Sequence, residues 1–140
     1  MKYSDVDTPS VLIDLDIVEA NIQKYQRYCN SIGLNLRPHI KTHKIPALAK
    51  LQLAEGAVGI TCQKISEAEA IISEGGIDDI LITYNIIGEK KLTRLLALAE
   101  RVKLSVVADN QTCISGLSEV FSKSNAELTV LVECDTGAMR

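Results

Sequence analysis

Expected strand ends recur at a nearly constant interval along this 140-residue chain, and that regularity is the strongest constraint on its fold. Each expected strand is followed by a turn and then by an amphipathic helix. Successive strand ends are 22, 22, 24 and 26 residues apart, at Lys41, Gln63, Asn85, Asp109 and Asp135. Strands that alternate with helices predict a parallel sheet with right-handed crossovers. The sequence therefore indicates an α/β fold, either a βα-barrel or an open doubly wound sheet.

Turn residues and helix caps set the boundaries of the expected elements. Asp16 with Glu19, and Ser66 with Glu69, have the spacing of capping boxes at helix starts. Asn110 is the expected N-cap of the last helix. The expected helices begin near residues 16, 46, 66, 88 and 110. The expected strands are 10–15, 34–41, 57–63, 79–85, 103–108 and 127–135.

Side-chain alternation distinguishes between the two folds. In the strand that ends at Lys41, the apolar Leu36 and Ile40 alternate with Arg37 and His39. Later strands also have one apolar face and one face that becomes polar toward the carboxyl end. An open parallel sheet needs two apolar faces, whereas a barrel accepts polar groups at its mouth. The alternation favours a TIM-type (β/α)8 barrel with Arg37, His39 and Lys41 facing the mouth.

The chain is too short for a complete barrel. A closed barrel of this kind has eight strands and about 250 residues. This sequence offers five regular units, preceded by the additional strand 10–15. We therefore expect the N-terminal part of a barrel that belongs to a longer protein.

Composition excludes several classes of protein. With 46% hydrophobic and 24% charged residues, the chain can fill a core. A net charge of −3 argues against nucleic-acid binding and against a basic membrane-binding patch. No apolar run approaches the ~20 residues of a membrane span, and the N-terminus lacks an apolar signal segment. Without a CxxC pair, free thiols in a cytoplasmic protein are expected at Cys29, Cys62, Cys113 and Cys134.

The segment RPHIKTHK, residues 37–44, holds most of the candidate functional groups. A lysine at the carboxyl end of a barrel strand suits covalent imine chemistry with a carbonyl group. A solvated basic turn would contain the same residue types, so the segment alone leaves both interpretations open. His39 and His43 are four residues apart across a turn rather than on a helix, so no metal site is predicted there.

Four segments occur in a characteristic order: DTPSVLIDLD, RPHIKTHK, GITCQKISEAE and VLVECDTGAMR. Through these motifs, residues 7–140 resemble the family of D-threonine aldolases and D-serine dehydratases and, more distantly, the N-terminal domain of alanine racemases. These are fold-type III pyridoxal-phosphate enzymes. The resemblance implies that residues 17–140 form an incomplete cofactor-binding (β/α) barrel. It also implies that residues 1–16 form a strand that joins a separate C-terminal β-domain.

The resemblance implies roles for individual residues. Lys41 matches the lysine that holds pyridoxal 5′-phosphate covalently as an imine, and Lys44 is the rival candidate. Arg140 matches an arginine that hydrogen-bonds the phenolic oxygen of the cofactor in alanine racemases. His39 is expected beside Lys41, orienting it or the substrate. Gln63 is expected at the inward end of its strand, either as a cofactor contact or as a polar plug.

The implied activity is that of a pyridoxal-phosphate-dependent lyase that cleaves D-3-hydroxy-amino acids to glycine and an aldehyde. A D-serine dehydratase or an amino-acid racemase is the alternative within this fold. Ile45 stands where alanine racemases have a tyrosine, which argues against the racemase. The resemblance also implies a divalent metal with ligands beyond residue 140, and it allows a homodimer. A non-catalytic cofactor-binding protein and a plain α/β binding domain are alternatives of other classes.

Two acidic residues near the end of the chain complete the expected site. Glu133 is expected to point inward, where a salt bridge with Arg37 would compensate its charge. Asp135 and Gly137 are expected to shape the turn that presents Arg140.

Overall fold

A parallel sheet is the centre of the computed structural model, which describes residues 3–139. Its strand order is β1-β2-β3-β4, so each strand pairs with the one before it. The strands are β1 (Ile60–Cys62), β2 (Asp79–Ile82), β3 (Lys103–Ala108) and β4 (Thr129–Val132). The α-helices are α1 (Leu15–Ser31), α2 (Pro46–Ala54), α3 (Ile65–Ser73), α4 (Glu89–Ala99) and α5 (Gln111–Phe121). The 3-10 helices are η1 (Tyr3–Asp5) and η2 (Ile40–Thr42). The expected α/β fold with a parallel sheet is confirmed.

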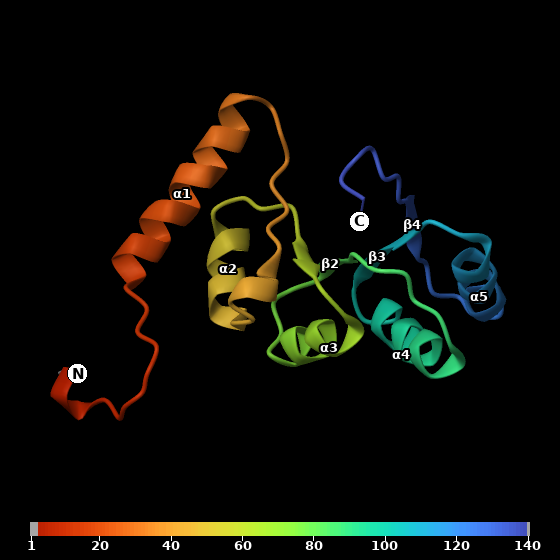
Figure 1. Ribbon diagram of the computed structural model, residues 1–140, viewed down its shortest axis with the longest axis horizontal. Helices are drawn as coiled ribbons and strands as arrows, with labels where there is room; N and C mark the ends of the chain where they lie inside the picture. The colour runs from red at the N-terminus through yellow and green to blue at the C-terminus, as the bar shows by residue number, and fades with distance from the viewer. Residues whose placement is uncertain (1–2, 140) are drawn as a thin grey trace.

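Helices α3, α4 and α5 lie in a row along one side of the sheet (Figure 1). The strand register places Ile60, Ile80 and Leu104 side by side, and all three belong to the buried core that these helices share. Neighbouring residues of a strand point to opposite faces. The alternate row, on the face away from these helices, is Thr61, Leu81, Ser105 and Thr129. One apolar face under helices and one more polar face are what an arc of a barrel requires.

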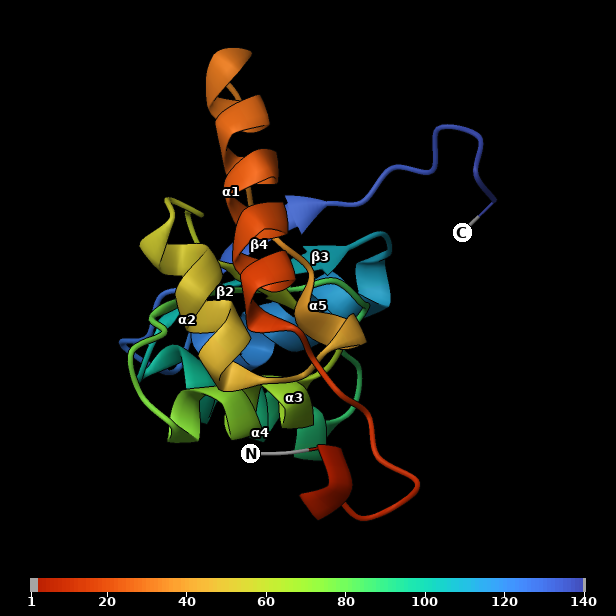
Figure 2. The ribbon, with the colours of Figure 1, turned by 90° about the vertical axis from the view of Figure 1, so that its left-hand side faces the viewer.

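Helix α1 and strand β4 leave apolar side chains uncovered. Helix α1 extends away from the sheet (Figures 1 and 2), and Gln26 is its one buried residue. Its Tyr25 and Tyr28 are exposed, as are Val130 and Val132 of β4. Within residues 3–139, no helix combines the length and the apolarity needed to cross a membrane.

The expected strand 10–15 is absent from the described structure. Residues 10–14 form no regular element, and α1 begins at Leu15. Asp14, rather than Asp16, caps the helix, because its backbone is extended and its side chain accepts a hydrogen bond from Ile17 N at 3.2 Å. A strand also needs a hydrogen-bonding neighbour, and no described residue pairs with this segment. Association of residues 1–16 with a separate β-domain stays a prediction.

The expected strand 34–41 is reduced to a partial one. Its backbone runs beside β1, where Leu36 O and Pro38 O accept hydrogen bonds from Val58 N and Thr61 N at 2.9 and 2.8 Å. Only an isolated bridge, from His39 to Thr61, is formed. Pro38 has no N–H to donate, so it interrupts the ladder. The chain then turns into η2, which places Lys41 on a 3-10 turn rather than on a strand.

The predicted helix caps are partly correct. Asn110 caps α5 as expected, with its Oδ1 accepting a hydrogen bond from Cys113 N at 2.9 Å. The expected capping box of Ser66 and Glu69 is wrong, because α3 begins one residue earlier and its N-cap makes no side-chain hydrogen bond. Glu69 instead forms an ion pair with Arg94 of α4.

The four cysteines are free, as expected. Cys62 and Cys113 are buried, Cys29 is half-buried and Cys134 is exposed. Burial raises the pKa of the Cys62 thiol to about 12. Cys62 is therefore a core side chain and not a thiolate nucleophile at neutral pH.

Candidate functional site

A cavity of about 560 Å³ opens at the carboxyl ends of the strands. Residues that follow each of the four strands line it, together with two residues from the segment before β1. The lining residues are His39, Lys41, Gln63, Thr83, Tyr84, Asn85, Asp109, Glu133 and Asp135. In barrel enzymes the active site lies at this end of the strands. The position predicted for the site therefore coincides with the cavity.

Lys41 and His39 reach the cavity from the turn η2. Ile40 lies between them and is fully buried, which anchors the turn in the core. His39 Nδ1 accepts a hydrogen bond from Lys41 N at 3.3 Å. Burial, followed by the positive charge of Lys41, lowers the pKa of His39 below its usual value. The imidazole is therefore neutral at pH 7.

Lys44 lies outside the cavity, unlike Lys41. Its Nζ contacts Glu67 Oε1 at 2.5 Å, and its backbone adopts a left-handed conformation with φ of 54°. The N–H of Lys44 donates to Ile40 O at 2.8 Å, which closes the turn. The geometry therefore distinguishes the two candidate lysines. Lys41 lines the cavity, whereas Lys44 is ion-paired with Glu67 outside it.

Gln63 lies directly after β1 and lines the cavity, as expected. Its backbone N–H donates to Glu67 Oε2 at 2.5 Å, so the amide side chain is presented by a fixed backbone. On the neighbouring strands, Asn85 Oδ1 accepts a hydrogen bond from Asp109 N at 3.2 Å and joins the ends of β2 and β3.

Arg37 does not face the cavity, and its expected salt bridge with Glu133 is wrong. Arg37 Nη1 contacts Asp79 Oδ1 at 2.8 Å, at the amino end of β2, and Lys103 Nζ contacts Asp79 Oδ2 at 3.0 Å. Arg37 therefore lies at the amino ends of the strands, whereas Lys41 lines the cavity at their carboxyl ends. Residues on one face can thus lie at opposite ends of a barrel. Glu133 lines the cavity instead.

Asp135 organises the turn after β4, as expected. Its Oδ1 accepts hydrogen bonds from the backbone N–H groups of Gly137, Ala138 and Met139 at 2.9, 2.9 and 3.2 Å. Gly137 has φ of 127°, a conformation that favours glycine. Arg140 lies outside the described residues, so its expected cofactor contact stays a prediction.

Tyr84 is a cavity residue that the alternation of side chains missed. The pattern assigns it to the apolar face with Ile80 and Ile82, but β2 ends at Ile82 and the alternation ends with it. Tyr84 therefore turns to the cavity. Lys91 Nζ lies 5.8 Å from the centroid of its ring. The available signal was an aromatic residue with a polar tip near the expected carboxyl end of a strand.

The cavity carries several groups that fit an aromatic aldehyde cofactor. Lys41 offers a primary amine, His39 a neutral imidazole, and Tyr84, Asn85 and Gln63 offer a phenol and two amides. The volume lies within the usual range for cofactor pockets. No cluster of three metal-ligating side chains occurs within residues 3–139. His43 Nδ1 accepts a hydrogen bond from Ile45 N at 3.0 Å, and His43 is not among the residues lining the cavity.

Comparison with known proteins agrees with this geometry. The family model for the alanine racemase N-terminal domain matches residues 13–140. D-threonine aldolase from Arthrobacter sp. is 44% identical, over 96% of this chain and 35% of the relative. 3-Hydroxy-D-aspartate aldolase from Paracoccus denitrificans (strain Pd 1222) is 39% identical, over 100% of this chain and 36% of the relative.

A solved structure gives the same result. The crystal structure of D-threonine aldolase from Filomicrobium marinum matches with a TM-score of 0.94 and 43% identity, covering 99% of this chain and 37% of that chain. The chain spans about a third of the length of the curated relatives it matches. As its motifs indicate, the chain belongs to the alanine racemase N-terminal domain family.

Proposed function

We propose that this chain forms the lysine-bearing part of a pyridoxal-phosphate site in a lyase that acts on D-3-hydroxy-amino acids. The supporting observation is the placement of the two lysines. Lys41 lines the cavity beside His39, whereas Lys44 is paired with Glu67 outside it. Lys41 is therefore the residue that would hold the cofactor covalently.

Four residues at the cavity have a chemical task in this proposal. When bound, pyridoxal phosphate supplies an electron sink for a bond that breaks at the α-carbon of an amino acid. Lys41 Nζ would hold the cofactor and, when free, would donate or accept a proton in the cavity. The neutral His39, held at Nδ1 by Lys41 N–H, orients the turn that carries this amine. Gln63 and Asn85 offer amide groups that hydrogen-bond a polar ligand.

The substrate class is proposed from the named relatives. Two of them are called D-threonine aldolase and 3-hydroxy-D-aspartate aldolase, at 44% and 39% identity. D-threo-3-hydroxyaspartate dehydratase from Delftia sp. (strain HT23) is 32% identical. The higher identity to the aldolases favours retro-aldol cleavage to glycine and an aldehyde. Dehydration of a D-3-hydroxy-amino acid is the second candidate because the dehydratase shares the same kind of substrate.

Several finer properties accompany this proposal. One solved structure is a D-threo-3-hydroxyaspartate dehydratase C353A mutant in the metal-free form, which supports our proposal of a divalent metal whose ligands lie beyond residue 140. We further propose a cytoplasmic enzyme that forms a homodimer and has no nucleic-acid or membrane partner.

A product assay tests the proposed function. The full-length protein, supplied with pyridoxal phosphate and a divalent metal, is incubated with D-threonine, L-threonine or D-serine. Glycine and acetaldehyde from D-threonine alone would support the aldolase, whereas a keto acid and ammonia would support the dehydratase. Cofactor binding without turnover of any hydroxy-amino acid would overturn the lyase and indicate a non-catalytic cofactor-binding protein.

A further inference from the structure

Glu67 is a buried carboxylate that the proposed reaction leaves without a task. It lies in the first turn of α3, and its side chain is only 4% exposed. Both carboxylate oxygens are engaged, because Oε1 contacts Lys44 Nζ at 2.5 Å and Oε2 accepts the Gln63 N–H at 2.5 Å. A buried charge with two charge-assisted hydrogen bonds defines the positions of both partners.

The two partners of Glu67 belong to the two segments that bring functional groups to the cavity. Lys44 follows η2, the turn that carries Lys41, and Gln63 follows β1. Glu67 therefore ties the lysine-bearing turn to the end of the neighbouring strand from outside the cavity. The isolated bridge between His39 and Thr61 is the last backbone pairing of these two segments before both lead to the cavity.

The turn itself needs such support. Lys44 has φ of 54°, a left-handed conformation that residues with a side chain adopt at a cost. Pro38 interrupts the strand that would otherwise hold this segment. The ion pair with Glu67 holds the turn in place of the missing ladder.

Glu67 also balances a concentration of positive charge. Lys41 and Lys44 lie three residues apart in the sequence. Burial alone would raise the pKa of Glu67, but hydrogen bonds from Lys44 and from the Gln63 amide outweigh it, so the pKa lies below its usual value. The carboxylate is therefore ionised at neutral pH.

We propose that Glu67 is a positioning residue, which acts through Lys44 and Gln63 to hold the Lys41 turn at a fixed place against β1. This inference rests on the proposed function, in which Lys41 binds the cofactor. Glu67 does not touch the cavity and is not among its lining residues.

Glu69 offers a matched control on the same helix. It is also an ion-paired carboxylate, but its partner Arg94 belongs to α4 and both side chains are more than a third exposed. Glu69→Gln therefore removes a charge and an ion pair from α3 without loosening the Lys41 turn. Glu67→Gln removes the charge that holds the turn.

The experiment measures three properties of the full-length protein: the rate at which pyridoxal phosphate attaches to the cofactor-free form, the circular dichroism of the bound cofactor, and amide hydrogen exchange. In Glu67→Gln we expect attachment to slow about tenfold and the cofactor dichroism to weaken, because the amine is less well oriented. The Gln63 amide should exchange about tenfold faster. Glu69→Gln should stay within about twofold of the wild type in all three measurements.

Three outcomes decide the inference. If Glu67→Gln attaches the cofactor at the wild-type rate with unchanged dichroism, the positioning role is overturned while the proposed function stands. If the wild-type protein attaches no cofactor, the proposed function fails and the inference fails with it. If Glu67→Gln does not fold, Lys44→Gln replaces it, since the amide keeps a donor for Glu67 but removes the charge. A smaller slowing of attachment in Lys44→Gln supports the role, and a wild-type rate overturns it.

Discussion

Arg37 and Asp79 join segments 42 residues apart through a contact of 2.8 Å between Arg37 Nη1 and Asp79 Oδ1. The guanidinium also approaches Ile60 O at 3.4 Å, so it links the segment before β1 to β1 and β2 at their amino ends. Neither side chain is more than a quarter exposed. The pair therefore lies at the end of the sheet opposite the cavity. We expect it to stabilise the fold and to take no part in the reaction.

Asp79→Asn should destabilise the full-length protein in a pH-dependent way. Burial alone would raise the pKa of Asp79, but hydrogen bonds from Arg37 and Lys103 outweigh it, so its folded-state pKa lies below the usual value. A lowered pKa gives stability that is present above the unfolded pKa of about 4 and is lost as pH falls through the folded value. Urea denaturation at pH 7 should show a loss of about 1–2 kcal/mol. The difference in the free energy of unfolding between wild type and variant should become smaller below about pH 4.

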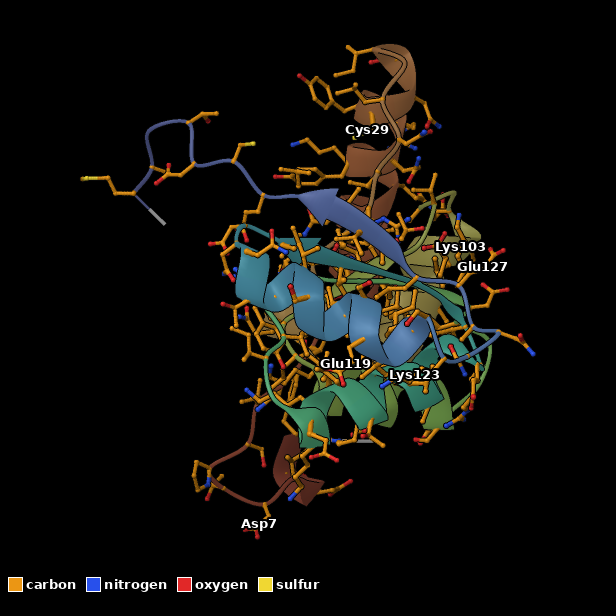
Figure 3. The ribbon with its side chains drawn as sticks, turned by 90° about the vertical axis from the view of Figure 1, so that its right-hand side faces the viewer. Asp7, Cys29, Lys103, Glu119, Lys123 and Glu127 are labelled. Carbon is orange, nitrogen blue, oxygen red and sulfur yellow. The ribbon has the colours of Figure 1, made fainter. Side chains whose placement is uncertain are left out.

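An exposed ion pair supplies the control for this prediction. It joins Glu119 of α5 to Lys123, which follows the helix (Figure 3). Both side chains are largely exposed, and their charged atoms are 3.4 Å apart. Glu119→Gln should change the free energy of unfolding by less than about 0.5 kcal/mol. If the loss of unfolding free energy in Asp79→Asn stays constant as the pH falls below about 4, the lowered pKa of Asp79 is contradicted.

Gly59→Ala should be markedly destabilising. A Cβ at this position would lie 2.2 Å from Arg37 Nη1 and 2.7 Å from Asp79 O. The backbone oxygen cannot move away without disturbing β2, so we expect a loss of about 2 kcal/mol in urea denaturation. Gly116→Ala is the contrast, because its Cβ would meet only the flexible Leu92 Cδ1 at 3.1 Å. That variant should lie within about 1 kcal/mol of the wild type.

Lys41→Ala should abolish both the near-visible absorbance of the bound cofactor and the turnover in the full-length protein. Lys44→Ala should retain the absorbance, because the Lys44 side chain is directed at Glu67 and not at the cavity. Borohydride reduction followed by peptide mapping identifies the modified residue directly. Reduced cofactor on Lys44, or on no lysine of residues 37–44, would refute the assignment.

Arg140→Ala should keep the covalent cofactor but lose turnover. The prediction follows from the family motif, in which the arginine after the DTG turn tunes the electron demand of the cofactor ring through its phenolic oxygen. Asp135, which accepts three backbone N–H groups, holds the start of this turn. The absorbance of the bound cofactor measures whether the cofactor is retained, and steady-state assays measure whether turnover is lost. Turnover equal to that of the wild type would remove Arg140 from the site.

The parts of the fold that could be predicted from sequence depend on local signals. Strand β3 has the predicted bounds, 103–108, and Asn110 caps the next helix as expected. The α4 helix begins directly after Gly88. In each case the residues that define the boundary lie within or next to the element, so no distant contact is needed to place it.

The parts that could not be predicted depend on distant partners. Arg37 shares a face with Lys41 in the sequence pattern, yet its partner is Asp79 because distance along the strand separates the two ends of the sheet. Glu67 and Glu69 look alike in the sequence, and only the packing of α3 buries one and leaves the other near the surface. Lys41 and Gln63 were predicted as site residues because they end expected strands, whereas Tyr84 was missed because β2 ends at Ile82, three residues before the expected end at Asn85.

The strand order β1-β2-β3-β4 has a consequence for how the chain folds during synthesis. Each strand finds its neighbour among residues that have already left the ribosome, and the sequence separation between partners is small. Short separations keep the entropy of loop closure low. The sheet can therefore grow one βα unit at a time in the direction of translation, with β4 as its newest edge.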